Sequence, residues 1–416
     1  MKITSILLCA ALLLLLLAGC KSVPEAETLP ESGGEVDDAA QISLVEQMVT
    51  LLSSCLDTQE GFYCGLGSLL YFCPKNGDRF IPLCGKPNCK HNDANCNAVI
   101  DGWSDKLGYY NGAIYSLDEI NQNLDHTFAQ RNMDGTDHKT IAIVELSRYG
   151  FQPEKETSII SQIDFYRGKA YFALHTPWYE PGEHLYHMIV VNLADGSQTE
   201  FGAELFRNGG MEHPSFRNGK MYGFAVHNVD LETGKEDRTL MEVDLETGAA
   251  TEIPIPTEKI YGQELVTDST VYYMERESAD EEPSRLRFKE YDRVSGAIKD
   301  YESPVEITTD NIVRFADDFI YVLPDMFREK PGNLYFLSRD YKLVDQIELR
   351  ENLECIAATK DRVYFTDGSV DPEAKTDVYV YYLEKSQIGS HSLKLEKLPM
   401  LVAQEEWNYF PDEETQ

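Results

Sequence analysis

The chain has 416 residues, 42% hydrophobic and 26% charged, which is the composition of a folded globular protein and not of a disordered one. It has 71 acidic residues against 37 lysines and arginines, so the formal net charge is −34. An acidic surface repels the phosphates of nucleic acids and of anionic lipids. We therefore expect neither nucleic-acid binding nor membrane docking through a polybasic surface.

The N-terminal segment has the pattern of an export signal. Lys2 precedes an apolar run from Ile3 to Leu17, which is short for a membrane span, and small residues follow it. We therefore expect residues 1–19 to be a signal peptide that is no part of the fold. A plain secretory signal that happens to end in a cysteine, or a buried leucine helix, is the alternative.

The end of this segment, Leu17-Ala18-Gly19-Cys20, resembles the lipobox of bacterial lipoproteins. The resemblance implies cleavage before Cys20 and lipid attachment to Cys20. It also implies a protein that is exported, anchored to the cell membrane and facing the outside or the periplasm. Residues 20–43 are rich in Pro, Glu, Gly and Asp, so they are expected to form a flexible acidic tether.

The folded body is expected to span residues 44–405 and to begin with a compact four-stranded unit. Its predicted strands, with a tight turn at Asn76-Gly77, are Val49 to Leu56, Gly61 to Tyr63, Ser68 to Phe72 and Arg79 to Leu83. Residues 44–56 could instead form an amphipathic helix. The weak helix formers Thr50, Ser53 and Ser54 favour the strand.

Six cysteines lie within this first unit and the segment that leaves it. Cys55 and Cys64 flank the first predicted hairpin symmetrically, as an inter-strand disulfide would require. A denser group has the spacing Cys-x4-Cys-x-His-x4-Cys and consists of Cys84, Cys89, His91 and Cys96.

Two interpretations of this group compete. Three thiols and an imidazole complete a tetrahedral shell for a structural zinc ion. Exported proteins oxidise their thiols, so disulfides are the favoured interpretation, with Cys89 and Cys96 able to close a small loop around His91. Either way, one thiol is left over, most simply a buried Cys355 on a late strand.

The remainder of the body repeats with a period of about fifty residues. A turn followed by a strand with an aromatic residue recurs, ending at Tyr115, Tyr171, Tyr222, Tyr272, Tyr321 and Tyr364. A second turn follows each of the first five aromatics at a similar distance: Asp134-Gly135, Asp195-Gly196, Thr247-Gly248, Ser295-Gly296 and Tyr341-Lys342.

This period suits a four-stranded sheet, and no run of crossover helices is present. The sequence therefore predicts an all-β fold, a single β-propeller of about seven four-stranded blades, with six or eight as alternatives and a pair of β-sandwiches as the competing architecture. Residues 406–416 are expected to be an acidic C-terminal tail.

The repeats resemble those of exported bacterial propeller lipoproteins, including families of unassigned function with blades like those of the low-density-lipoprotein-receptor and TolB propellers. The resemblance covers about residues 45–400. The Tyr-Trp-Thr-Asp signature of the receptor class is absent. The segment of Cys84 to Cys96 is similar to one found in exported Gram-positive propeller lipoproteins.

Loops between second and third strands are where propellers commonly bind ligands. Three of them carry a net negative charge, namely Asp118 to His126, His227 to Arg238 and Glu275 to Leu286, which suits a cation, a basic peptide or an amine-bearing glycan. A fourth loop offers aromatic and imidazole groups for a sugar or aromatic ligand: His175, Trp178, Tyr179 and His184. A solvated acidic surface, and aromatics folded back onto the blade, are the simpler explanations.

No sequence motif of an enzyme is present: Gly-x-Ser-x-Gly, His-Glu-x-x-His and a phosphate loop are all missing. We expect a membrane-anchored extracytoplasmic propeller that binds an extracellular ligand or a partner protein, including a partner in a membrane complex. The alternative is an extracytoplasmic hydrolase or lyase that acts on a glycan or a peptide, because propeller enzymes assemble their sites from scattered residues.

Overall fold

A computed structural model describes the chain between residues 49 and 400. Residues 51–54, 67–68, 76, 92–94, 101–105, 120–124, 152–158, 161–162, 176–185, 203–208, 231–234, 257–259, 279–282, 317, 325–329, 351–352 and 368–378 are not described. The expected signal peptide (1–19), tether (20–43) and C-terminal tail (406–416) lie outside the described residues. Within the described part, no helix is long and apolar enough to cross a membrane.

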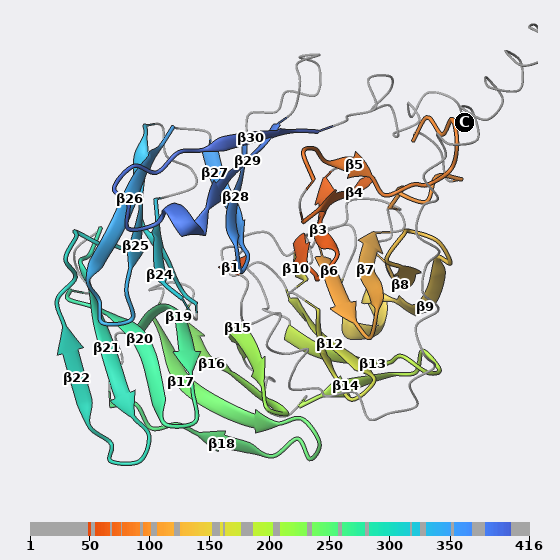
Figure 1. Cartoon of the computed structure of the whole chain (residues 1–416). Coiled ribbons are helices and arrows are strands. Elements are labelled where there is room, and N and C mark those ends of the chain that lie inside the picture. Colours follow the sequence, from red (N-terminus) through yellow and green to blue (C-terminus); the bar gives the residue numbers. More distant parts are fainter. Residues whose placement is uncertain are drawn as a thin grey trace, which may run out of the picture. The chain divides into compact units, whose positions relative to one another are not determined.

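Seven antiparallel sheets follow one another along the chain and form a seven-bladed β-propeller, as the sequence predicts (Figure 1). The first three blades contain β2 (Cys55–Asp57), β3 (Gly61–Leu66), β4 (Leu69–Pro74) and β5 (Ile81–Pro82); β6 (Lys106–Tyr110), β7 (Ala113–Glu119), β8 (His126–Asn132) and β9 (Lys139–Val144); and β10 (Ile159–Ile160), β11 (Asp164–Tyr166), β12 (Lys169–His175), β13 (Tyr186–Asn192) and β14 (Gln198–Phe201). In the third blade, β10 and β11 both pair with β12.

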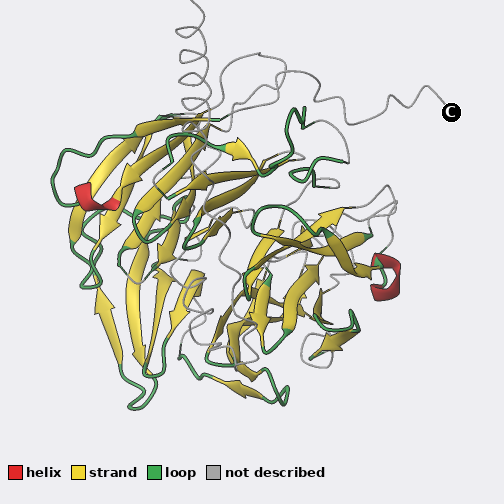
Figure 2. Cartoon of the chain, turned by 45° about the vertical axis from the view of Figure 1, so that its right-hand side comes forward, coloured by secondary structure: helices red, strands yellow, loops and turns green. Residues whose placement is uncertain are grey.

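The fourth to seventh blades are built in the same way. They contain β15 (Gly209–Arg217), β16 (Lys220–Asp230), β17 (Lys235–Asp244) and β18 (Ala250–Glu252); β19 (Ile260–Val266), β20 (Thr270–Arg276), β21 (Leu286–Asp292) and β22 (Ile298–Tyr301); β23 (Ile312–Phe315), β24 (Ile320–Leu323), β25 (Gly332–Leu337) and β26 (Leu343–Leu349); and β27 (Leu353–Ala358), β28 (Arg362–Asp367), β29 (Tyr379–Glu384) and β30 (Glu396–Pro399). The described helices are two short 3-10 turns, η1 (Leu146–Tyr149) and η2 (Lys385–Gln387), so strands dominate (Figure 2).

The predicted first strand, Val49 to Leu56, is wrong as a single element. Its first residues form β1 (Val49–Thr50), which pairs antiparallel with β27 of the seventh blade, whereas Cys55 begins β2 of the first blade. The N-terminal end of the body therefore contributes a strand to the last sheet. A second link joins the same blades, because the Phe80 amide donates to the carbonyl of Pro399 at 3.0 Å.

The apolar cores lie between neighbouring blades. Each of six buried clusters draws side chains from at least two successive sheets, as where Phe128 of β8 meets Phe172 of β12 at 6.0 Å between ring centroids. The cluster that joins the seventh blade to the first two includes Tyr364, Phe62 and Ile114. Because each sheet buries both faces against its neighbours, no blade carries a core of its own.

Tight turns join first strands to second strands and most third strands to fourth strands; in the seventh blade, residues 385–395, which include η2, join β29 to β30. Asn111-Gly112, Arg167-Gly168 and Asn218-Gly219 all have positive φ at both positions, the type I′ geometry that matches the twist of paired strands. In the other class, Gly135, Gly196, Gly248, Gly296 and Tyr341 have positive φ. Both predicted classes of turn are confirmed.

Four of the second-to-third connections are longer and span residues 176–185, 277–285, 324–331 and 368–378, whereas those of the first and fourth blades span only 67–68 and 231–234. The predicted loops at Asp118 to His126 and Glu275 to Leu286 agree within two residues with the ends of β7, β8, β20 and β21. The predicted loop from His227 to Arg238 is wrong, because β16 extends to Asp230 and β17 starts at Lys235, with Asp230 opposite Lys235. The two strands of this hairpin stay paired through their main chains, although their sequence here is polar and lacks the alternation typical of strands.

Candidate functional site

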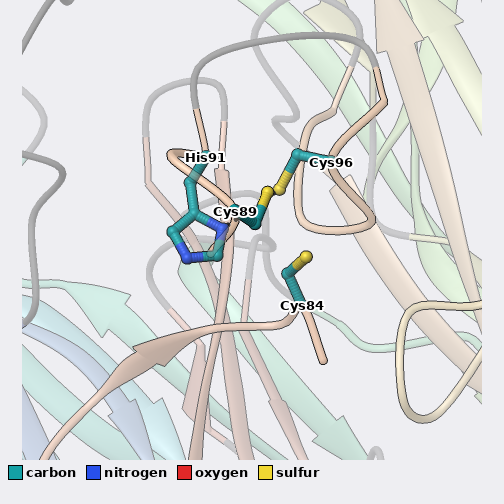
Figure 3. Close-up of side chains that lie close together, drawn as sticks. All are labelled: Cys84, Cys89, His91 and Cys96. Carbon is teal, nitrogen blue, oxygen red and sulfur yellow. Dashed lines mark hydrogen bonds between the residues drawn. The ribbon is translucent and has the colours of Figure 1, made fainter. Parts of the chain in front are cut away.

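The described part of the chain contains one group of at least three potential metal ligands, and it is the predicted one. Cys84 follows β5 by two residues, and Cys89, His91 and Cys96 lie in the irregular segment that leads to the second blade. Their ligand atoms all lie within 4.8 Å of one another, and Figure 3 shows the four side chains gathered together.

Local turns bring these residues to one place. The Cys84 amide donates to the Pro82 carbonyl and the Cys89 amide to the Lys86 carbonyl. Asn88 and His91 adopt positive φ of 59° and 58°, which reverses the chain on either side of Cys89. His91 Nδ1 then lies 3.2 Å from Cys96 Sγ, and the Ala98 amide donates to the same sulfur at 3.3 Å.

The surroundings of these side chains shift their pKa values in different directions. Burial acts to raise the pKa of the Cys84 thiol, but backbone N–H donors of Lys86 and Asn97 and the neighbouring thiols outweigh burial, so this pKa lies below its usual value. Burial raises the pKa of Cys96 to about 12. Burial also lowers the pKa of His91, which favours the neutral imidazole that metals bind.

The second blade holds the far end of this segment. The fully buried Arg131 of β8 donates from Nη1 to the carbonyls of Asn97 and Val99, both at 3.2 Å. On the other side, the Leu70 amide of β4 donates to the Ala98 carbonyl at 2.8 Å. The segment is thus attached to both the first and the second blade. Sequence reasoning missed Arg131, which has no local signal because its partners lie more than thirty positions away.

The other predicted cysteine pair faces across two adjacent strands. Cys55 of β2 is the register partner of Cys64 of β3, both are buried, and their sulfur atoms are 3.3 Å apart. Contact with Cys55 and burial raise the pKa of Cys64 well above its usual value. Cys355 lies buried on β27, as predicted, and Cys73 is buried on β4.

The predicted aromatic loop is described only at its ends. His175 is the last residue of β12, pairs with Tyr186 and stacks on its ring at 5.9 Å. Trp178, Tyr179 and His184 lie outside the described residues.

The two ends of the blades differ in construction. At the tight-turn end, ion pairs cross between blades: Arg167 bonds Glu246, and Arg293 donates to Glu242 at 2.5 Å. Glu242 also accepts from Lys220. Burial opposes ionisation of Glu242, but these two cations lower its pKa below the usual value. Sequence reasoning missed this network, whose members are spread over three blades.

The opposite end carries the second-to-third connections, and the four longest span residues 176–185, 277–285, 324–331 and 368–378. It also carries the segments that lead from one blade to the next.

Comparison with known proteins gives distant matches to solved structures. No family model and no curated protein matches the chain. The acylaminoacyl peptidase of Pyrococcus horikoshii matches with 13% identity and a TM-score of 0.36, over 55% of this chain and 38% of the peptidase, so the match spans about two fifths of that protein.

A Synechocystis ACO mutant matches with 9% identity and a TM-score of 0.38, over 68% of each chain. The AfRom2 CNH domain matches with 8% identity and a TM-score of 0.42, over 77% of this chain and 94% of the domain. At these TM-scores, the similarity supports no statement about activity.

Proposed function

We propose that this protein is an exported, lipid-anchored β-propeller that binds an extracellular ligand or partner protein at the end of the blades where the second-to-third connections emerge. The lipobox-like Leu17-Ala18-Gly19-Cys20 supports the anchor, and Cys20 is the residue that would carry the lipid.

The difference between the two blade ends is the observation that carries the binding proposal. At the tight-turn end, inter-blade pairs such as Arg167 with Glu246 and Lys385 with Asp318 join neighbouring blades. The second-to-third connections at the other end vary from two residues (67–68) to eleven (368–378), so several are long enough to carry binding groups. Binding groups commonly lie on such loops, positioned by a rigid scaffold.

The chemistry of these connections favours a cationic or amine-bearing ligand. The connection between β7 and β8 contains Asp125, and that between β20 and β21 contains Asp280, Glu281 and Glu282. The connection between β12 and β13 adds Trp178 and Tyr179, whose rings can stack on a sugar or cover a cation.

Binding is tested with the purified full-length protein in detergent, against an array of amine-bearing glycans and an oligolysine peptide. A variant with Trp178→Ala and Tyr179→Ala, and one with Asp280→Asn and Glu281→Gln, should each lose at least tenfold in affinity for the probe that the wild type retains. The matched charge control is Glu252→Gln with Glu348→Gln, on the exposed outer strands β18 and β26. Equal loss in the control, or no loss in either loop variant, would reject this end as the binding surface.

Anchoring is tested separately by labelling cells with an alkyne fatty acid. The wild type should incorporate the label and a Cys20→Ser variant should not. Incorporation by the variant would place the lipid elsewhere, and no incorporation by the wild type would reject the anchor. Neither result depends on the binding test.

A further inference from the structure

We propose that Cys84, Cys89, His91 and Cys96 bind one Zn²⁺ ion in a closed structural site that fastens the connection between the first and second blades.

The spacing of the ligand atoms fits a tetrahedral zinc shell. With Zn–S bonds of about 2.3 Å and Zn–N bonds of about 2.0–2.1 Å, neighbouring ligand atoms of such a shell lie about 3.5–3.8 Å apart. The four ligand atoms here lie within 4.8 Å of one another, and His91 Nδ1 lies 3.2 Å from Cys96 Sγ. Small side-chain adjustments are enough to close the shell around one ion.

The composition of the group favours zinc over a disulfide. A bridge between Cys89 and Cys96 would use two of the four side chains and would give no reason for Cys84 and His91 to converge on the same point. The Ala98 amide donates to Cys96 Sγ, the kind of second contact that orients and stabilises a metal-bound thiolate. Three thiolates and one imidazole form one of the standard structural zinc shells. Thiolate ligands also favour zinc over magnesium and calcium, which prefer oxygen ligands.

Four protein ligands leave no open position, so the site is structural and does not activate water. On binding, each of the three thiols releases its proton to solvent as its sulfur forms a bond to zinc, and the imidazole binds in its neutral form. Cys96 is buried, whereas Cys84, Cys89 and His91 are partly exposed, so the ion can enter from solvent.

The place of the site in the fold explains what the ion would do. Between β5 and β6, the described residues form no helix and no strand. Leu83, at the start of this segment, lies against the second blade, since a Cβ on Gly135 would stand 2.5 Å from the Leu83 carbonyl oxygen. Arg131 holds the far end through Asn97 and Val99. Zinc between these two attachments would fix the segment where it has no regular backbone pairing.

The test is cobalt substitution of the reduced, chelator-stripped full-length protein. Co²⁺ should bind one equivalent per chain, giving the intense visible bands of tetrahedral thiolate coordination and a thiolate-to-cobalt band in the near ultraviolet. Zn²⁺ should then displace it. Cys84→Ser and His91→Asn should weaken cobalt binding at least tenfold, whereas Cys73→Ala, a buried cysteine outside the group, should leave it unchanged.

Circular dichroism of each variant shows whether it is folded, so that a loss of cobalt binding is not mistaken for unfolding. Lost binding in a folded Cys84→Ser variant supports the site. Absence of the tetrahedral spectrum in the folded, reduced wild type, or equal binding by Cys84→Ser, His91→Asn and Cys73→Ala, would overturn it. These outcomes do not involve the blade end proposed for ligand binding.

Discussion

Phe62 of the first blade stacks on Tyr364 of the seventh blade, with ring centroids 4.2 Å apart and planes inclined by 10°. The two residues are about three hundred positions apart in the chain, and both are buried. Together with the pairing of β1 with β27 and the bond from Phe80 to Pro399, this contact joins the two ends of the propeller. The ring of seven blades is therefore closed by aromatic packing as well as by the pairing of β1 with β27.

The contact predicts coupled losses of stability. Phe62→Ala and Tyr364→Ala should each lower the free energy of unfolding by about 3–5 kcal/mol, as expected for large buried aromatics. The double variant should lose less than the sum, by about 0.5–1.5 kcal/mol, because the stacking is removed only once. Urea unfolding measures all three. Phe62→Ala combined with Tyr291→Ala, from the fifth blade, is the control and should be additive; additivity in both pairs would contradict a closing contact.

Two glycines in equivalent turns should respond differently to alanine. Gly196 and Gly296 have φ of 70° and 71°, so both substitutions carry the same backbone penalty. A Cβ at Gly196 would lie 2.2 Å from the Ile141 carbonyl oxygen of the second blade, whereas nothing lies within 4 Å at Gly296. Gly196→Ala should therefore destabilise the protein by about 1–3 kcal/mol more than Gly296→Ala. Equal midpoints in thermal unfolding would show that the turn of the third blade does not press on β9.

His126 should make stability depend on pH. Burial lowers its pKa to about 4, although Asp125 acts in the opposite direction, while the unfolded chain has a histidine pKa of about 6.5. The unfolded state therefore gains a proton first on acidification. The contribution of His126 to the free energy of unfolding is fully present above about pH 6.5. It falls by up to about 3 kcal/mol as the pH drops to about 4, and it does not change further at lower pH.

The measurement is the free energy of unfolding of the wild type and of His126→Leu between pH 4 and pH 7.5. The difference between the two curves should change across this window in favour of the variant at low pH. Parallel curves would mean that His126 is protonated equally in the folded and unfolded states.

Cys55 and Cys64 should be linked by a disulfide in protein exported to an oxidising compartment. Their positions are directly opposite on β2 and β3, and their sulfur atoms need to move by little more than 1 Å to bond. A non-reducing peptide map should recover the two residues in one linked peptide. Complete alkylation of both thiols before reduction would contradict this pairing.

The turns of the propeller were predictable because their signal is local. Asn111-Gly112 and Asn218-Gly219 require positive φ at adjacent residues, and the sequence shows this directly. The grouping of Cys84 with Cys96 was also readable, since turns within thirteen residues bring the members together.

Contacts between distant residues were not predictable. The pairing of Val49 with Ala358 leaves no trace in either segment, so a single strand to Leu56 was the natural expectation. Arg131 looks like an exposed cation in the sequence, and its burial depends on the carbonyls of Asn97 and Val99 in the segment between the first and second blades. The polar end of β16 was missed because main-chain pairing, and not apolar alternation, extends that hairpin to Asp230.

A native mass spectrum of freshly purified, unreduced protein shows whether the metal centre between the first and second blades exists. One zinc ion should be bound to the folded chain and lost on acid denaturation, after which Cys84, Cys89 and Cys96 should be free thiols. A metal-free folded chain in which Cys89 and Cys96 form a disulfide would contradict it.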